Sequence, residues 1–167
     1  MNVEAIIKTD KKIPLTSRTI IHLMLIHNKV SEHISYALKP FGISIQQFNV
    51  LRILRGQQGK PANLSTLNER MVSKMSNTTR LVDKLLKKGY ANRIVCVSNR
   101  RKVEITITDE GLEVLTEMDL SLGMELEGFE PPEEEQALAA RVAELCQQRI
   151  EEANTTAEKE ARYLLRS

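Results

Sequence analysis

The chain has 167 residues, of which 41% are hydrophobic, 28% charged and 4% aromatic. That length can bury one core with an appended helical part, and no run approaches the roughly 18 consecutive apolar residues that a membrane span requires. The chain does not open with a charged and then apolar signal peptide, so we expect a soluble cytoplasmic protein without a membrane partner.

The net charge of +2 conceals a division between the two ends of the chain. Residues 1–108 hold 19 of the 24 Lys and Arg and 6 of the 22 Asp and Glu, a net charge of +13. Residues 109–167 hold the remainder, a net charge of −11. This segregation predicts a basic half that faces a polyanion and an acidic half that is kept away from it.

The first third of the chain predicts an arm and one long helix. Residues 1–14 are mixed in character and end at Pro14, which predicts a loosely held arm. Thr16 or Ser17 is expected to cap a helix that runs to about Leu38. Apolar residues cover more than one narrow stripe of this helix, so we expect it to pack on its own domain and on a second copy of the chain.

Two shorter helices follow a break at residues 40–42. Ser44 and Gln47 form a capping-box pattern that opens a helix ending near Gly56. Asn63 is expected to cap a third helix that ends at Met71. A tight turn then leads into a basic helix, so the last two helices make a helix-turn-helix.

The basic helix is predicted from a cap at Ser73 to a stop at Gly89. One of its faces has the spacing of buried positions, at Thr78, Leu81, Val82, Leu85 and Leu86. The other face is polar and basic, with residue types that reach base edges and phosphates. Ser76, Arg80, Asp83, Lys84 and Lys87 project there, with Asn77 and Thr79 beside them.

The periodicity changes to two after Gly89. Residues 93–97 and 103–107 alternate as strands around a polar turn at residues 98–101, which predicts a β-hairpin with an arginine pair at its tip. A basic helix followed by a hairpin predicts a winged helix-turn-helix, whose helix enters the major groove and whose tip enters the minor groove. The alternative is a solvated charged helix on an ordinary hairpin.

The acidic end of the chain predicts two more helices. Thr108 should cap a helix to about Leu126, with Asp109 and Glu110 at its positive end. Residues 125–132 interrupt the pattern, and residues 133–135 open a last helix through Ile150. The sequence leaves the order and role of residues 153–167 open.

We find no residues at catalytic or metal-binding spacing, and we expect neither an enzyme nor a cofactor. His22, His27 and His33 lie five and six residues apart, which does not place two ligands on one helix face. Cys96 and Cys146 lack a paired spacing. A redox role for either cysteine stays an open alternative.

Six motifs follow one another within residues 43–51, 67–71, 79–85, 88–90, 99–101 and 107–111. Together they resemble the MarR family of bacterial winged helix-turn-helix regulators, and the resemblance spans roughly residues 15–120. One departure lies in the wing, where the family has Asp-x-Arg and this chain has Asn99, Arg100 and Arg101. An asparagine can still bond the arginine, but it loses the charge-assisted pairing that would stiffen the tip.

The resemblance implies a mainly α fold with a small β-hairpin wing (α+β), in which N- and C-terminal helices form a dimerisation region. The implied parts are an arm (1–14), a dimerisation helix (15–42), a winged helix-turn-helix DNA-binding domain (43–108), C-terminal dimerisation helices (109–152) and a tail (153–167). The implied partners are a second copy of the chain and double-stranded DNA that carries a pseudo-palindromic operator. The resemblance also implies a bacterial protein that is associated with the nucleoid when it is bound to its operator.

The resemblance also implies which residues bind DNA and what regulates the protein. Candidate contacts in the recognition helix are Ser76, Asn77, Thr78, Thr79, Arg80 and Lys84, and in the wing Asn99, Arg100, Arg101 and Lys102. The implied function is a transcriptional regulator, usually a repressor, released by a small and partly aromatic effector. His22, Ile26 and Phe48 are candidates for the effector pocket, with core packing as the alternative. The competing function is a winged helix that coats DNA nonspecifically or binds proteins.

Overall fold

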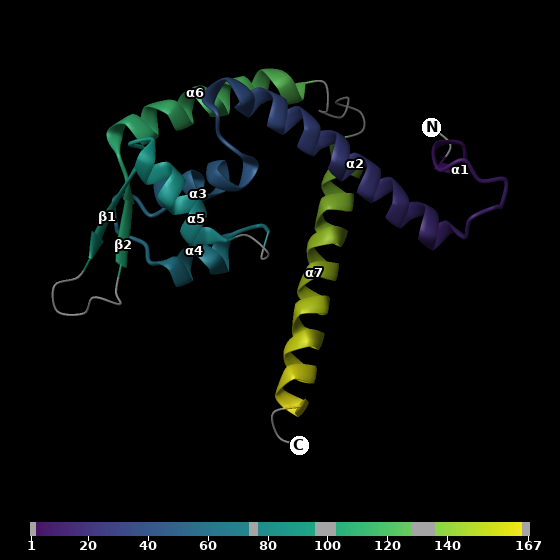
Figure 1. Ribbon diagram of the computed structural model, residues 1–167. Helices are drawn as coiled ribbons and strands as arrows, with labels where there is room; N and C mark the ends of the chain where they lie inside the picture. The colour runs from purple at the N-terminus through teal and green to yellow at the C-terminus, as the bar shows by residue number, and fades with distance from the viewer. Residues whose placement is uncertain (1–2, 74–76, 96–102, 128–135, 165–167) are drawn as a thin grey trace. The chain divides into compact units, whose positions relative to one another are not determined.

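The computed structural model describes residues 3–73, 77–95, 103–127 and 136–164. The chain divides into two compact units, Met1–Glu127 and Gly128–Ser167. Figure 1 shows the helices and the hairpin of the first unit and the single long helix of the second. Among the described helices, none combines the length and the apolar composition that a membrane span requires.

The observed elements confirm a mainly helical fold with a two-stranded antiparallel hairpin. In chain order they are α1 (Val3–Ile6), α2 (Leu15–Leu38), a 3₁₀ turn η1 (Lys39–Phe41), α3 (Ile45–Arg55), α4 (Leu64–Arg70), α5 (Thr78–Lys87), β1 (Ala91–Val95), β2 (Val103–Ile107), α6 (Asp109–Leu126) and α7 (Gln136–Leu164).

Three predicted helix caps are confirmed. The Ser44 hydroxyl accepts from the Gln47 N–H while the Gln47 side chain accepts from the Ser44 N–H, which completes the capping box of α3. The Asn63 and Thr108 side chains each accept a hydrogen bond in the first turn of α4 and α6. These bonds satisfy N–H groups that have no partner inside a helix, so a local sequence pattern was sufficient to locate them.

Two predicted helix starts are wrong. α2 begins at Leu15, directly after Pro14, and has no side-chain cap from Thr16 or Ser17. α5 begins at Thr78 instead of following a cap at Ser73, because the Asn77 side chain accepts from the Arg80 N–H at 3.2 Å. Both stretches contain more than one residue able to cap, but α2 uses none of them and α5 uses Asn77.

Two further boundaries differ from the prediction. β1 starts at Ala91, two residues early, because Ala91 pairs with Ile107 at the base of the hairpin. α7 continues to Leu164, beyond the expected end near Ile150, so residues 153–164 of the predicted tail are helical. The described side chains of α7 are exposed, and i,i+3 ion pairs join Arg141 to Glu144 and Arg149 to Glu152.

The core of the first unit lies between α2, α3, α5, α6 and the hairpin. Its completely buried side chains come from all five of these elements and from α4: Leu38, Val50, Leu51, Leu67, Val82, Leu85, Ile105, Leu115 and Met118. α2 and α6 also pack along each other. Three polar contacts support α6, from His33 Nδ1 to Glu125 Oε1 (2.8 Å), from the Ser121 hydroxyl to the Ala37 carbonyl (3.3 Å) and from Arg55 to Asp119 (2.6 Å).

α2 also carries apolar side chains that its own unit does not cover. They are Leu15, Ile20, Leu23, Met24 and Ile26, each more than half exposed. The sequence predicted more than one packing partner for this helix, and the exposed side chains fit that expectation.

The hairpin is joined to the helical part of the unit beside the middle of β2 and at the base of the hairpin. Away from the tip, Ala62 pairs with Ile105 through two backbone hydrogen bonds of 2.8 and 2.9 Å, so a residue of the loop before α4 adds a bridge beside β2. At the start of α6, the Thr108 hydroxyl donates to the Gly89 carbonyl and accepts from the Gly111 N–H. A single threonine therefore ties the end of α5 to the start of α6.

Gly111 sits where two backbone segments come closest. A Cβ at this position would lie 2.2 Å from the Tyr90 carbonyl oxygen and 2.9 Å from Ile107 Cγ1. Gly123, on the same helix, would meet nothing within 4 Å. The two glycines of α6 therefore respond oppositely to the same substitution.

Gly111→Ala should destabilise the protein by about 2 kcal/mol or more, because the turn at Tyr90 must move to admit a methyl group. Gly123→Ala should stabilise it by about 0.5–1 kcal/mol, because alanine is the better helix former. Urea unfolding of both variants measures the two changes. Equal effects would contradict the close approach at Tyr90.

Candidate nucleic-acid interface

One face of α5 is fixed against the rest of the unit. Val82 and Leu85 are completely buried, and Leu81 and Leu86 are half-buried, as the periodicity predicted. Thr78 is also buried, and its hydroxyl donates to the Asn68 side chain on α4. This contact joins the two helices of the helix-turn-helix and fixes the rotation of α5 about its axis.

Thr78 is therefore an error among the candidate DNA contacts. Its side chain is 4% exposed and bonds to α4. Thr78 therefore occupies the buried position that its helical spacing predicted and does not face the DNA-binding side of α5. A threonine hydroxyl bonded inside the core satisfies a buried polar group and is not available to a base edge.

The opposite face of α5 is exposed and basic. Arg80, Lys84 and Lys87 follow each other at i+4 and i+3 spacing, which aligns them along one side of the helix. We call these three residues the basic stripe. Asn77 begins the same line and Thr79 lies beside it, both exposed, although the Asn77 amide oxygen is engaged as the helix cap.

Asp83 is engaged in an ion pair that the sequence did not reveal. Its Oδ1 accepts from Arg93 Nη2 at 2.7 Å, with side chains 44% and 28% exposed. Arg93 lies on β1, so this pair attaches the middle of α5 to the base of the wing. It also compensates the one acidic side chain among the described residues of α5, which leaves the exposed face positive.

Lys88 connects the last turn of α5 to the α2–α3 junction. Its ammonium donates to the Phe41 carbonyl at 3.3 Å and lies 5.9 Å from the centre of the Tyr90 ring. A Cβ on Gly42, whose φ is +60°, would lie 3.2 Å from this ammonium. Lys88 therefore helps to hold the end of α5 against the rest of the unit, whereas the basic stripe faces solvent.

Several predicted site residues lie outside the described residues. These are Ser76 before α5 and the wing-tip residues Asn99, Arg100, Arg101 and Lys102, together with Cys96. Their proposed contacts remain predictions. The two strands that lead to the tip are described, and they form the predicted antiparallel pair in the register Ala91–Ile107 to Val95–Val103.

The three candidate effector residues lie in different environments. Phe48 is a core residue, 5% exposed, with the Arg52 guanidinium 5.7 Å from its ring centre. Ile26 is 57% exposed and His22 is half-buried. None of the three lines either of two surface cavities found in the described part of the chain, one at residues 12–15 and 18 and one along α2 from His27 to Lys39.

The described residues give no indication of a metal site. No group of three or more His, Cys, Asp or Glu side chains among them could hold a metal ion. His33, one of the three histidines of α2, bonds to Glu125. Cys146 is a free and exposed thiol on α7.

Comparison with known proteins identifies this architecture. The MarR family model matches residues 43–103, from the start of α3 into the hairpin. The HTH-type transcriptional regulator YkoM of Bacillus subtilis is 30% identical over 115 residues, which cover 65% of this chain and 72% of YkoM. The chain belongs to the MarR family. As a member of the MarR family, it is a DNA-binding transcriptional regulator.

Two solved structures share the fold of this MarR-family chain. A MarR-like transcription regulator from Bacillus cereus superposes with a TM-score of 0.69 at 22% identity, covering 81% of this chain and 99% of the other. CouR from Rhodococcus jostii, solved with p-coumaroyl-CoA bound, gives a TM-score of 0.67 at 20% identity, covering 81% and 94%.

The Asp83–Arg93 pair should contribute a measurable coupling energy. We expect a double-mutant cycle of Asp83→Ala and Arg93→Ala to give about 0.5–1 kcal/mol, because both side chains are partly shielded from water. The same cycle on Arg149 and Glu152, which are 82% and 64% exposed, should give less than about 0.5 kcal/mol. Thermal unfolding measures both cycles, and equal coupling would contradict a special role for the wing-base pair.

Proposed function

We propose that this MarR-family protein is a sequence-specific repressor that binds a pseudo-palindromic operator as a homodimer. The observation that carries the proposal is the geometry of α5, one face of which is fixed by Thr78, Val82 and Leu85 while the basic stripe faces solvent. A helix held this way can enter the major groove with its cations aimed at bases and phosphates.

The wing supplies the second contact in this proposal. The hairpin extends from α5 and is attached to it through Arg93 and Asp83. Arg100 or Arg101 at its tip would enter the minor groove, where the negative potential favours arginine. Asn77, Thr79, Arg80 and Lys84, with Ser76, are the proposed contacts in the major groove.

Dimerisation would place two copies of α5 on successive half-sites. Half-sites lie about one turn of DNA apart, roughly 34 Å. The exposed apolar side chains of α2 beyond its first turn, at Ile20, Leu23, Met24 and Ile26, supply a surface for a second copy. The acidic α6 carries no Lys or Arg that would compete with the basic stripe for DNA. A small effector that altered the spacing between the two copies of α5 would release the operator. The structure of CouR supports this part of the proposal, because CouR has the same fold and was solved with p-coumaroyl-CoA bound.

The proposal is tested with duplex DNA taken from upstream of the protein's own gene and a scrambled duplex as control. At about physiological salt, a specific regulator should prefer the upstream duplex by roughly a thousandfold or more. Equal weak binding to both would contradict sequence-specific regulation. That outcome would favour a winged helix that coats DNA or binds proteins.

Arg80→Ala should weaken operator binding by about 1–3 kcal/mol and leave the fold intact, because Arg80 is exposed and outside the core. Lys29→Ala is the matched control, since it removes an exposed charge on α2 that lies outside the proposed interface. Fluorescence anisotropy with the operator duplex measures both. Unchanged operator affinity of the Arg80 variant would mean that this face of α5 does not read the operator.

Arg101→Ala should lower affinity and reduce the salt slope of binding by about one unit, because one phosphate or minor-groove contact is lost. The slope is obtained from binding constants measured between low and physiological salt. A slope equal to that of the unmodified protein would mean that the wing tip does not touch DNA.

A further inference from the structure

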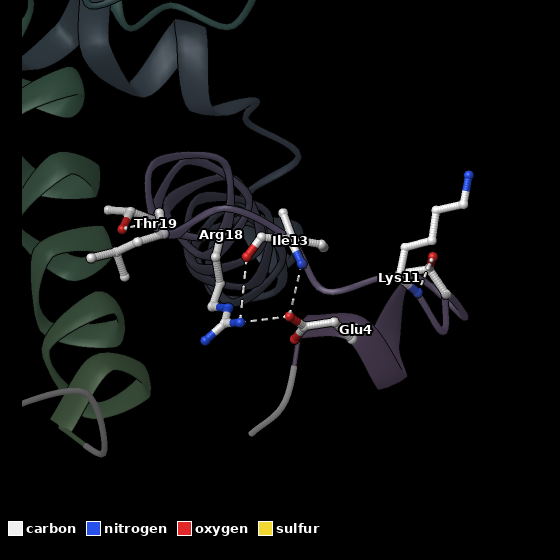
Figure 2. Close-up of polar contacts among 7 residues, drawn as sticks. Glu4, Lys11, Ile13, Arg18 and Thr19 are labelled. Carbon is white, nitrogen blue, oxygen red and sulfur yellow. Dashed lines mark hydrogen bonds and ion pairs between the residues drawn. The ribbon is translucent and has the colours of Figure 1, made fainter.

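The N-terminal segment folds back on the first turn of α2 and brings a carboxylate onto an arginine. After α1, Lys8 adopts a left-handed backbone conformation and the Thr9 N–H donates to the Glu4 carbonyl, which reverses the chain. Glu4 Oε1 then accepts from Arg18 Nη2 at 2.7 Å and from the Ile13 N–H at 3.5 Å (Figure 2). We call residues 3–14 the hook.

Among the described residues, the hydrogen-bond donors and the arginine at the Glu4 carboxyl group favour its charged form, and burial opposes them. The pKa of Glu4 lies below its ordinary value because its own backbone N–H, the Ile13 N–H and the Arg18 guanidinium all stabilise the carboxylate. The charged Glu4 therefore stabilises the folded state at neutral pH. This stabilisation is lost as the pH falls below about 4, the ordinary pKa range of glutamate. At neutral pH the position is suited to an anion.

The surroundings of Arg18 include a cavity and a hydrogen-bond donor besides the groups that bind Glu4. A cavity of about 340 Å³ adjoins it, lined by Lys12, Ile13, Pro14, Leu15 and Arg18. Arg18 Nε is buried and has no hydrogen-bond partner among the described atoms, so a strong donor is left over. The Lys12 and Leu15 side chains are exposed at the rim, one cationic and one apolar.

We propose that Glu4 is the internal occupant of a binding site for a small monocarboxylate with a hydrocarbon body. The carboxylate of the ligand would replace Glu4 at Arg18 and at the Ile13 N–H, so one charged acceptor is exchanged for another. The hydrocarbon body would cover Ile13, Pro14 and Leu15 in the adjoining cavity, and this apolar contact would drive the exchange. Release of Glu4 opens the hook.

The lining selects against other anions. Phosphate is strongly hydrated and has no apolar part to place on Pro14 and Leu15, whereas a monocarboxylate matches the single charge that Arg18 now pairs with. The site lies on the hook and the first turn of α2, apart from α5. The inference therefore goes beyond the proposed function and stands or falls independently of DNA binding.

The test is a titration of the full-length protein with sodium hexanoate, followed by NMR at the Arg18 Nε–H and the Ile13 N–H. Glu4→Ala should bind hexanoate at least about tenfold more tightly than the unmodified protein, because an internal competitor that fills the site most of the time has been removed. Arg18→Gln should lose binding. Glu32→Ala and Lys29→Gln are matched controls, since these two exposed residues of α2 pair with each other at 3.4 Å and should leave the affinity unchanged.

Limited trypsin digestion gives a second readout. Hexanoate should speed cleavage after Lys8, Lys11 and Lys12 in the unmodified protein, because the hook opens, and should have little effect on Glu4→Ala, whose hook is already open. Thermal midpoints within a degree or two of each other would show that every variant is folded.

Four results would overturn the proposal. They are equal hexanoate affinity with and without Glu4, retained binding in Arg18→Gln, equal binding of hexan-1-ol or inorganic phosphate, and no binding to Glu4→Ala at millimolar hexanoate. Each of these can be obtained without operator DNA, so failure here is distinct from failure of the proposed repressor function.

Discussion

The fixed rotation of α5 is the constraint on which the rest of the proposed DNA interface depends. A helix can present its cations to DNA only if its opposite face is held, and here Val82 and Leu85 enter the core while Thr78 bonds to Asn68 on α4. Burial of the two aliphatic side chains supplies most of the energy, about 1.5–3 kcal/mol each. The Thr78 hydrogen bond adds direction, because it is satisfied at only one rotation of the helix.

The wing is built on that same helix. β1 follows α5 after a turn at Gly89, Thr108 bonds back to the Gly89 carbonyl, and Arg93 returns to Asp83. The hairpin base is therefore positioned by α5 and by the start of α6 together. Because α5 and the hairpin base are attached to each other, their spacing is constrained, and the proposed entry into two grooves of one duplex requires such a constraint.

The sequence predicted the fold well where the governing signal is local. The 3.6-residue period of α5, the capping box at Ser44 and the caps at Asn63 and Thr108 are properties of a few consecutive residues, and each was confirmed. The start of α5 failed because Ser73 and Asn77 are both good caps. The Arg93–Asp83, Ala62–Ile105 and Glu4–Arg18 contacts were missed because each joins elements whose approach is decided by tertiary packing. Helical spacing placed Thr78 on the buried face and the resemblance placed it among the candidate DNA contacts, and its burial in the structure supports the first position.

Gly111 shows how a single atom can limit the sequences that are compatible with this architecture. The Tyr90 carbonyl lies so close that any side chain at position 111 would collide with backbone, which cannot rotate away as a flexible side chain can. A lineage that replaced this glycine would have to rebuild the turn at Tyr90 in the same step. Gly123, which faces open space on the same helix, carries no such restriction. Substitutions should therefore accumulate freely at the exposed positions of α6 and only rarely at Gly111, where the helix meets the wing.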